Sequence, residues 1–231
     1  MQGPAARDLL LMFLCYIYVL AMIEAGHLLE ERGVSGSVPR KYLHAMIGNL
    51  PLVIPFFGWP PAPALVAAPF IIITLLASPY SPSPAMRRKL GRLSSLTEGG
   101  HSLGLFLYAC SYTLLAVLYP TRPHIIAAGV IPMAYGDTVA ALVGERYGRK
   151  GLVNGKTLEG TLGMFAASLM GLVLSLAYFS MLHPFTLVEV LPATVGVAVT
   201  VTVAELFSPG GFDNLAVPLL GAFAFMWLGG G

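Results

Sequence analysis

Long apolar runs dominate this chain and constrain its fold more than any single motif does. A membrane-crossing helix needs about 20 mostly apolar residues, and eight segments approach that length. They are residues 9–28, 43–59, 63–79, 103–120, 124–143, 160–182, 186–207 and 214–229. Only 10% of the 231 residues are charged, against about 25% in a soluble domain. Lipid rather than water must therefore cover most of the surface.

The sequence thus predicts an all-α fold, a polytopic membrane helical bundle that forms one domain over residues 1–231. The second and third segments are short and meet at a tight turn, Trp59-Pro60-Pro61. We expect eight transmembrane helices, or seven if these two segments form a re-entrant pair. The first segment ends without a clear small-x-small cleavage site, so it is interpreted as a transmembrane helix rather than a signal peptide.

The basic residues indicate how the bundle lies in the membrane. Three connections, 29–42, 80–102 and 144–159, carry 11 of the 13 basic residues, and only Arg7 and Arg122 lie elsewhere. Under the positive-inside rule these connections face the cytoplasm, which places both termini outside it. The net charge of +2 is too small to suggest nucleic acid as a partner.

Three acidic residues lie within the expected spans, close to their cytoplasmic ends: Glu24, Asp137 and Glu205. Ionisable groups inside a membrane are costly and tend to mark function, although pairing with a basic loop residue would also explain Glu24 and Glu205. Asp137 is the strongest candidate because a glycine-rich, basic segment follows it. The backbone N–H groups of glycine turns can cradle phosphate, and lysine adds a point charge.

That segment supplies most of the candidate nucleotide-binding residues. They are Gly136, Gly144, Gly148, Lys150, Gly155, Lys156, Thr157 and Gly160. The run Gly155-Lys156-Thr157 is not a P-loop, because the upstream glycine of that motif would fall at position 150, which is Lys150.

Two further polar segments are expected on the same side. In the first, Ser37 is a candidate N-cap, and Arg40, Lys41 and His44 share one helix face that would suit polyphosphate. In the second, Asp213 follows a Ser-Pro-Gly-Gly turn. Carboxylates near phosphates can hold Mg²⁺, which keeps several waters and needs few protein ligands. Asp137, Asp213 and Glu205 are therefore the candidate metal ligands, and His101 is a weaker catalytic candidate.

Four motifs, in order, resemble the family of polyprenol, dolichol and phytol kinases, which also includes a diacylglycerol kinase. They are Arg40-Lys41-x-x-His44; Gly136-Asp137-x-x-Ala140 with Gly144 and Gly148; Lys156-Thr157-x-Glu159-Gly160; and Glu205 followed by Asp213-Asn214-x-x-Val217-Pro218. Thr138 stands where a small residue such as alanine is expected. The resemblance implies a membrane enzyme that phosphorylates a lipid alcohol with a divalent cation, often with CTP as the phosphoryl donor.

On this basis we expect an NTP-dependent, specifically CTP-dependent, kinase for an isoprenoid alcohol such as phytol, geranylgeraniol, polyprenol or dolichol. Asp137 would bind Mg²⁺, with Asp213 and Glu205 as further ligands. Arg40, Lys41, Lys156 and Asn214 would hold the nucleotide. Either Glu159 or His44 would orient or deprotonate the acceptor hydroxyl, and the residues alone do not decide between them.

Other functions fit parts of the pattern. A CTP-dependent cytidylyltransferase that makes a CDP-lipid needs similar groups but releases pyrophosphate, whereas a kinase releases CDP. A diacylglycerol kinase would differ only in its acceptor. A membrane transporter would need polar residues through the midplane and on both faces, and here the outer face has almost none. A purely structural membrane subunit would explain the spans but not the clustered acids.

Overall fold

The computed structural model describes residues 3–34, 37–95 and 103–231, and this part of the chain is helical apart from turns and one isolated bridge. Four helices are long and apolar enough to cross a membrane: α1 (Ala6–Glu31), the continuous helix Pro123–Tyr147, α9 (Leu158–Ser180) and α10 (Leu187–Phe207). Three shorter apolar helices accompany them: α3 (Ala62–Ala77), α6 (Gly104–Leu118) and α11 (Asp213–Trp227). The predicted polytopic helical bundle is confirmed, while the number of crossings stays a prediction.

The second expected span, 43–59, is not one α-helix. It consists of α2 (Val38–Ile47) and a 3₁₀-helix, η1 (Leu50–Phe56). Pro51 and Pro55 lie inside the second piece, and because proline has no backbone N–H it cannot complete the α-helical hydrogen-bond pattern. A 3₁₀-helix rises about 2 Å per residue, so the two pieces together extend about 29 Å, close to the roughly 30 Å hydrocarbon thickness of a bilayer.

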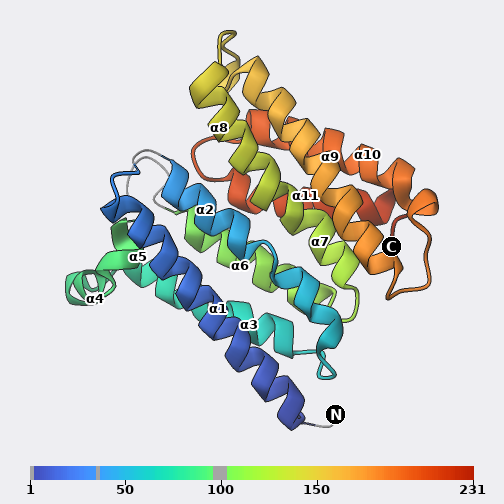
Figure 1. Ribbon diagram of the computed structural model, residues 1–231, viewed down its shortest axis with the longest axis horizontal. Coiled ribbons are helices and arrows are strands. Elements are labelled where there is room, and N and C mark those ends of the chain that lie inside the picture. The colour runs from blue at the N-terminus through green and yellow to red at the C-terminus, as the bar shows by residue number, and fades with distance from the viewer. Residues whose placement is uncertain (1–2, 35–36, 96–102) are drawn as a thin grey trace.

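The helices run roughly along one direction, so the bundle has two distinct ends (Figure 1). The start of α2, the short helices α4 (Pro84–Lys89) and α5 (Gly91–Ser95), and the C-terminal end of α8 (Asp137–Tyr147) lie toward one end. The N- and C-termini both lie toward the other. The basic connections are thus gathered at the end opposite the termini, while the side of the membrane that each end faces stays a prediction.

The continuous helix Pro123–Tyr147 contains a break in its hydrogen-bond pattern. It comprises α7 (Pro123–Ile131), a π-helical turn η2 (Pro132–Gly136) and α8. The Asp137 N–H donates to the carbonyl of Pro132, five residues earlier, and Pro132 itself has no N–H to donate. Every residue of α7 is buried, so the bundle fixes this helix and, with it, the position of Asp137 at the start of α8.

Candidate active site

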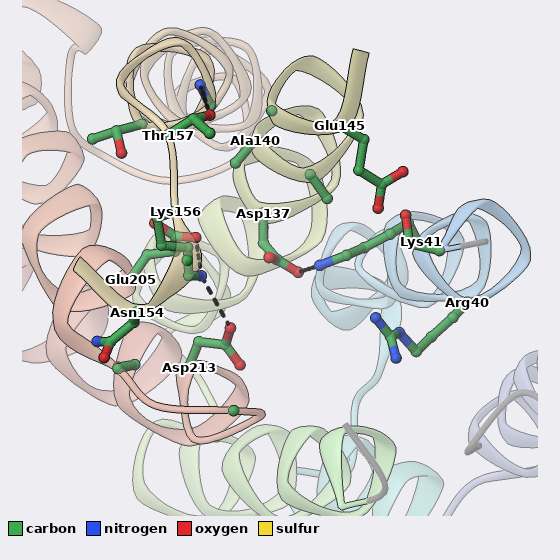
Figure 2. Close-up of a pocket in the computed structure, with 18 residues that line it drawn as sticks. Arg40, Lys41, Asp137, Ala140, Glu145, Asn154, Lys156, Thr157, Glu205 and Asp213 are labelled. Carbon is green, nitrogen blue, oxygen red and sulfur yellow. Dashed lines mark hydrogen bonds and ion pairs between the residues drawn. The ribbon is translucent and has the colours of Figure 1, made fainter. Parts of the chain in front are cut away.

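A cavity of about 480 Å³ opens at the end of the bundle where the basic connections lie. Such a volume is within the range of small-molecule sites, roughly 300–1,000 Å³. Its walls come from α2, α8, α9, α10, α11 and the connections before α9 and α11, so segments far apart in sequence meet here (Figure 2). The lining residues are Ser37, Arg40, Lys41, Asp137, Ala140, Ala141, Gly144, Glu145, Asn154, Gly155, Lys156, Thr157, Gly160, Thr161, Glu205, Ser208, Gly210 and Asp213.

One ion pair joins α2 to α8 at the cavity wall. The Lys41 ammonium contacts Asp137 Oδ2, and both side chains are largely buried. Figure 2 shows Lys41 reaching across from α2 to Asp137, while Arg40 points into the space beneath it. Asp137 starts α8 within the continuous helix Pro123–Tyr147, so the compensating charge comes from Lys41 rather than from a helix end.

A second ion-pair group joins three other segments. Lys156, in the connection before α9, contacts Glu205 Oε1 of α10, and its Nζ lies 3.7 Å from Oδ2 of Asp213 at the start of α11. Burial disfavours the ammonium form of Lys156, but the nearby carboxylates of Glu205 and Asp213 outweigh it and hold the Lys156 pKa above its ordinary value. Lys156 is therefore a cation at neutral pH.

The connection that carries Lys156 is a small hairpin. Gly151 pairs with Thr157, and the Lys156 N–H donates to the Val153 carbonyl. Asn154 and Gly155 between them have φ values of 56° and 72°, the left-handed pair that defines a type I′ turn. The Asn154 side chain also donates to the Leu206 carbonyl at 3.3 Å. The turn thereby fixes Lys156 over the cavity and ties the connection to α10.

The N-terminus of α9 forms another wall. Thr157 is its N-cap, and the Thr157 hydroxyl accepts a hydrogen bond from Gly160 N–H at 3.2 Å. A Cβ added to Gly160 would lie 2.8 Å from the Ala140 carbonyl oxygen, so glycine allows α9 to approach α8 closely. The Leu158 N–H donates to the Lys150 carbonyl at 2.9 Å, and the Gly160 N–H is taken by Thr157. This wall therefore offers an anion such as phosphate the positive end of the α9 dipole rather than free donors.

Several predicted site residues do not line the cavity. His44 is buried behind Lys41 and stacks on Tyr108, with the ring centroids 5.0 Å apart. Glu159 points back to its own connection, where it accepts hydrogen bonds from the backbone N–H groups of Arg149 and Lys150 at 3.0 and 3.4 Å. The catalytic roles considered for His44 and Glu159 stay predictions, without a position in the cavity wall.

Other candidates serve packing or lie at the margin. Gly136 lies against Ser168 and Met164 of α9, and Gly148 packs on Thr157. Lys150 is exposed, and none of these three lines the cavity. Asn214 is buried beside the cavity, where its side chain donates to the Gly211 carbonyl at 3.1 Å.

Glu24, Ser37 and His101 differ from the main group of candidates. Glu24 pairs with Arg92, which is the structural alternative considered for it. Ser37 lies at the N-cap position of α2, but its hydroxyl makes no capping hydrogen bond and lines the cavity instead. His101 lies outside the described residues.

The comparisons with known proteins identify the family of the chain. The chain is 35% identical over 226 residues to a phytol kinase from Synechocystis sp., an alignment that covers 92% of this chain and 91% of the relative. The chain belongs to the polyprenol and phytol kinase family. It is therefore a phosphotransferase that acts on an alcohol, which implies a nucleotide phosphoryl donor. No protein-family profile matches the chain. No solved structure matches it either.

In this kinase the cavity retains polar atoms that lack partners. Within the described residues Ser37 Oγ, Thr161 Oγ1 and Glu205 Oε2 are buried and make no hydrogen bond, and all three residues line the cavity. Buried polar groups are normally satisfied, so these atoms fit a polar ligand. Thr161 was not predicted; its place one turn after the Thr157 N-cap could have suggested it.

The acidic residues of the kinase cavity meet a minimal test for a divalent cation. No group of three or more His, Cys, Asp or Glu side chains is close enough to hold a metal by itself in the part of the chain that the structure describes. Glu205 and Asp213 nevertheless share one cationic partner, Lys156. Such a pair of carboxylates fits Mg²⁺, which is commonly bound by one or two carboxylates together with waters and substrate phosphates.

Proposed function

We propose that this chain is an NTP-dependent kinase, with CTP as the donor, that phosphorylates the hydroxyl of an isoprenoid alcohol at the cytoplasmic face of the membrane. The observation that carries this proposal is the union, in one cavity, of carboxylates, lysines and a helix N-terminus drawn from four distant segments. The phytol kinase relative supports the acceptor class, and the gathering of basic connections supports the cytoplasmic face.

The basic side chains and α9 would bind the phosphates of the nucleotide. Lys41 and Lys156 approach the cavity from opposite sides, and Arg40 lies beside Lys41. The N-terminal end of α9 adds the positive end of a helix dipole, which favours an anion. Phosphoryl transfer is catalysed mainly by positioning and by stabilisation of the charge on the transferred group. These cations and the helix dipole would supply that stabilisation.

The acidic side chains would hold Mg²⁺, with Asp137, Asp213 and Glu205 as the candidate ligands. When bound, the cation supplies neutralisation of the charge that develops between the phosphates. Each of these acids now contacts a lysine: Lys41 holds Asp137, and Lys156 holds Glu205 and Asp213. The same lysines are also the phosphate ligands that we propose. Nucleotide binding would therefore draw each lysine from its carboxylate toward a phosphate.

Transfer of γ-³²P from labelled CTP, ATP, GTP or UTP to phytol, geranylgeraniol and diacylglycerol in detergent tests the proposal. Label should appear in an isoprenyl monophosphate, CTP should be the best donor, and CDP should be released. Labelled diacylglycerol phosphate would instead reassign the acceptor, and pyrophosphate with a CDP-lipid would identify a cytidylyltransferase and contradict the kinase.

The Asp137→Asn variant tests the central acid. It keeps the size of the side chain but loses the charge, so we expect kcat to fall about 100-fold or more. Glu31→Gln is the matched control, since Glu31 is exposed at the end of α1 and contacts only His27 among the described residues. Full activity in Asp137→Asn would remove Asp137 from the site.

A further inference from the structure

A second, apolar cavity lies on the other side of α2 from the polar one. It is lined by α1, α2, η1, α3, α5 and α6. The lining residues are Val19, Ile23, Leu43, Ile47, Leu50, Ala67, Phe70, Thr74, Leu93, Leu105, Tyr108, Ala109 and Tyr112. The Thr74 hydroxyl is bonded to the Phe70 carbonyl at 2.5 Å, so it offers little to a polar ligand. The cavity suits a hydrocarbon.

The position of α2 connects the two cavities. Its residues Arg40 and Lys41 line the polar cavity, whereas Leu43 and Ile47 line the apolar one. His44 directly follows Leu43 and stacks on Tyr108, which itself lines the apolar cavity. A ligand held in the apolar cavity therefore lies one helix away from the pair of Lys41 and Asp137.

The apolar cavity extends along the direction in which a lipid chain would lie. It follows α6 from Leu105 to Tyr112, about 10 Å at the helical rise of 1.5 Å per residue. The N-terminal end of α6, which holds Leu105, lies near the end of the bundle where the polar cavity opens. Tyr112 lies further along α6, deeper in the bundle. An alcohol with its hydroxyl at the polar end would place its tail toward the middle of the bundle.

The side of the cavity formed by α1 is the part most easily moved. The cavity measures about 50 Å³, too small for a long chain, so part of its wall must yield. Of the 26 residues of α1 only Asp8, Cys15, Val19 and Gly26 are buried, and 11 of the others are exposed and available to lipid. A chain that enters from the bilayer would displace α1 rather than the buried helices behind it.

We infer that this apolar cavity binds the isoprenoid chain of the acceptor alcohol, with α1 as its displaceable wall. The inference rests on the proposed function and adds to it the place of the tail. The inference has two physical grounds. The lining of the cavity is apolar and therefore favours a hydrocarbon over a water-soluble ligand. The cavity also shares helix α2 with the proposed phosphoryl-transfer cavity.

Filling the cavity tests the inference. Ala67 is buried in its wall on α3, so Ala67→Phe should raise the KM for a C20 isoprenoid alcohol about tenfold or more. The KM for the nucleotide and the turnover of a five-carbon prenyl alcohol should stay unchanged. Ile72→Phe is the matched control, because Ile72 lies on the same helix and its side chain is 64% exposed. Equal KM values for the C20 alcohol in the two variants would overturn the inference.

Photo-crosslinking of the unmodified chain covers the case in which Ala67→Phe does not fold. A C20 alcohol with a diazirine near its terminal carbon should label peptides of α1, α3 or α6, and excess phytol should compete with it. Labelling confined to the lipid-facing surfaces of α9 and α10 would overturn the inference. If the wild-type chain phosphorylates no isoprenoid alcohol, the proposed function fails, and the label still reports what the cavity binds.

Discussion

At the scale of single residues, the site is organised around buried acids that each contact a lysine. Asp137, Glu205 and Asp213 are buried, and an isolated buried carboxylate is costly. Lys41 pairs with Asp137, and Lys156 pairs with both Glu205 and Asp213, so each acid has a cationic partner before any substrate arrives. Removing a lysine should therefore lower the stability of the fold, in addition to any effect on catalysis.

The Lys156→Met variant should therefore be less stable than the wild type. It leaves Glu205 and Asp213 without their shared cation, and removing one partner of a buried pair costs about 3 kcal/mol or more. The double variant Lys156→Met/Glu205→Gln should regain part of that loss, because one of the two buried charges is gone. Lys150→Met is the control, since Lys150 is exposed in the same connection. The free energy of unfolding in detergent measures the effect, and equal values for the single and double variants would refute it.

At the scale of the elements, the hairpin before α9 and the close contact of α8 with α9 place the groups that surround the cavity. Both depend on glycine for different reasons. Gly155 adopts a left-handed backbone in the turn, which L-residues with a Cβ disfavour. Gly160 allows the approach of the Ala140 carbonyl. The two glycines can therefore be tested separately.

The turn is tested by Gly155→Ala against Asn154→Gly. Alanine at φ 72° is strained by about 1–2 kcal/mol, so Lys156 should be held less firmly and the KM for the nucleotide should rise several-fold. Asn154→Gly keeps the left-handed conformation and loses only the bond to Leu206, so it should have the smaller effect. Steady-state kinetics with varied nucleotide decide this, and a larger effect in Asn154→Gly would show that the side-chain bond matters more than the turn.

The helix contact is tested by Gly160→Ala against Gly163→Ala on the same helix. A Cβ at Gly160 meets a backbone oxygen at 2.8 Å, whereas one at Gly163 meets the Val139 side chain at 3.4 Å. Overpacking typically costs about 1–3 kcal/mol, so Gly160→Ala should lower thermal stability and activity together. Gly163→Ala should resemble the wild type. Similar melting temperatures for the two variants would contradict the close approach as the cause.

At the scale of the whole molecule, the polar cavity and the basic connections share one end, and the termini lie at the other. This polarity predicts how the chain is oriented. In a background with Cys15 and Cys110 changed to alanine, Arg122→Cys should react with a membrane-impermeant maleimide added to intact cells. Arg149→Cys should react only after the membrane is opened. The reverse pattern would place the proposed site on the outer face.

The sequence alone was sufficient to predict the helical bundle and the approach of distant motifs to one another. The bilayer requires apolar runs in the spans and favours basic residues in the connections on one side, so both features can be read along the chain. It was insufficient for side-chain direction. Glu159 belongs to a motif of the family, yet its carboxylate is occupied by backbone N–H groups, and His44 is occupied by stacking on Tyr108. Both contacts depend on tertiary packing that no spacing along the chain encodes.

The type I′ turn could have been predicted more fully. Asn-Gly is the strongest short signal for a two-residue hairpin, so Asn154-Gly155 indicated that Lys156 would follow a defined turn rather than an open loop. The break of the second span could also have been anticipated from Pro51 and Pro55. The pairing of Lys156 with Glu205 and Asp213 could not, since these residues lie about 50 positions further along the chain, beyond α9.

The π-helical turn before Asp137 gives this helix one place where its length can change. A π turn holds one residue more than the α-helical turn it replaces, so the extra residue leaves the direction of the side chains that follow nearly unchanged. Deleting one residue within Pro132–Gly136 would therefore let the helix become regular while the carboxylate of Asp137 still faced Lys41. Deleting one residue within α7 would instead rotate Asp137 by about 100° relative to the buried residues before the deletion, and the contact with Lys41 would be lost.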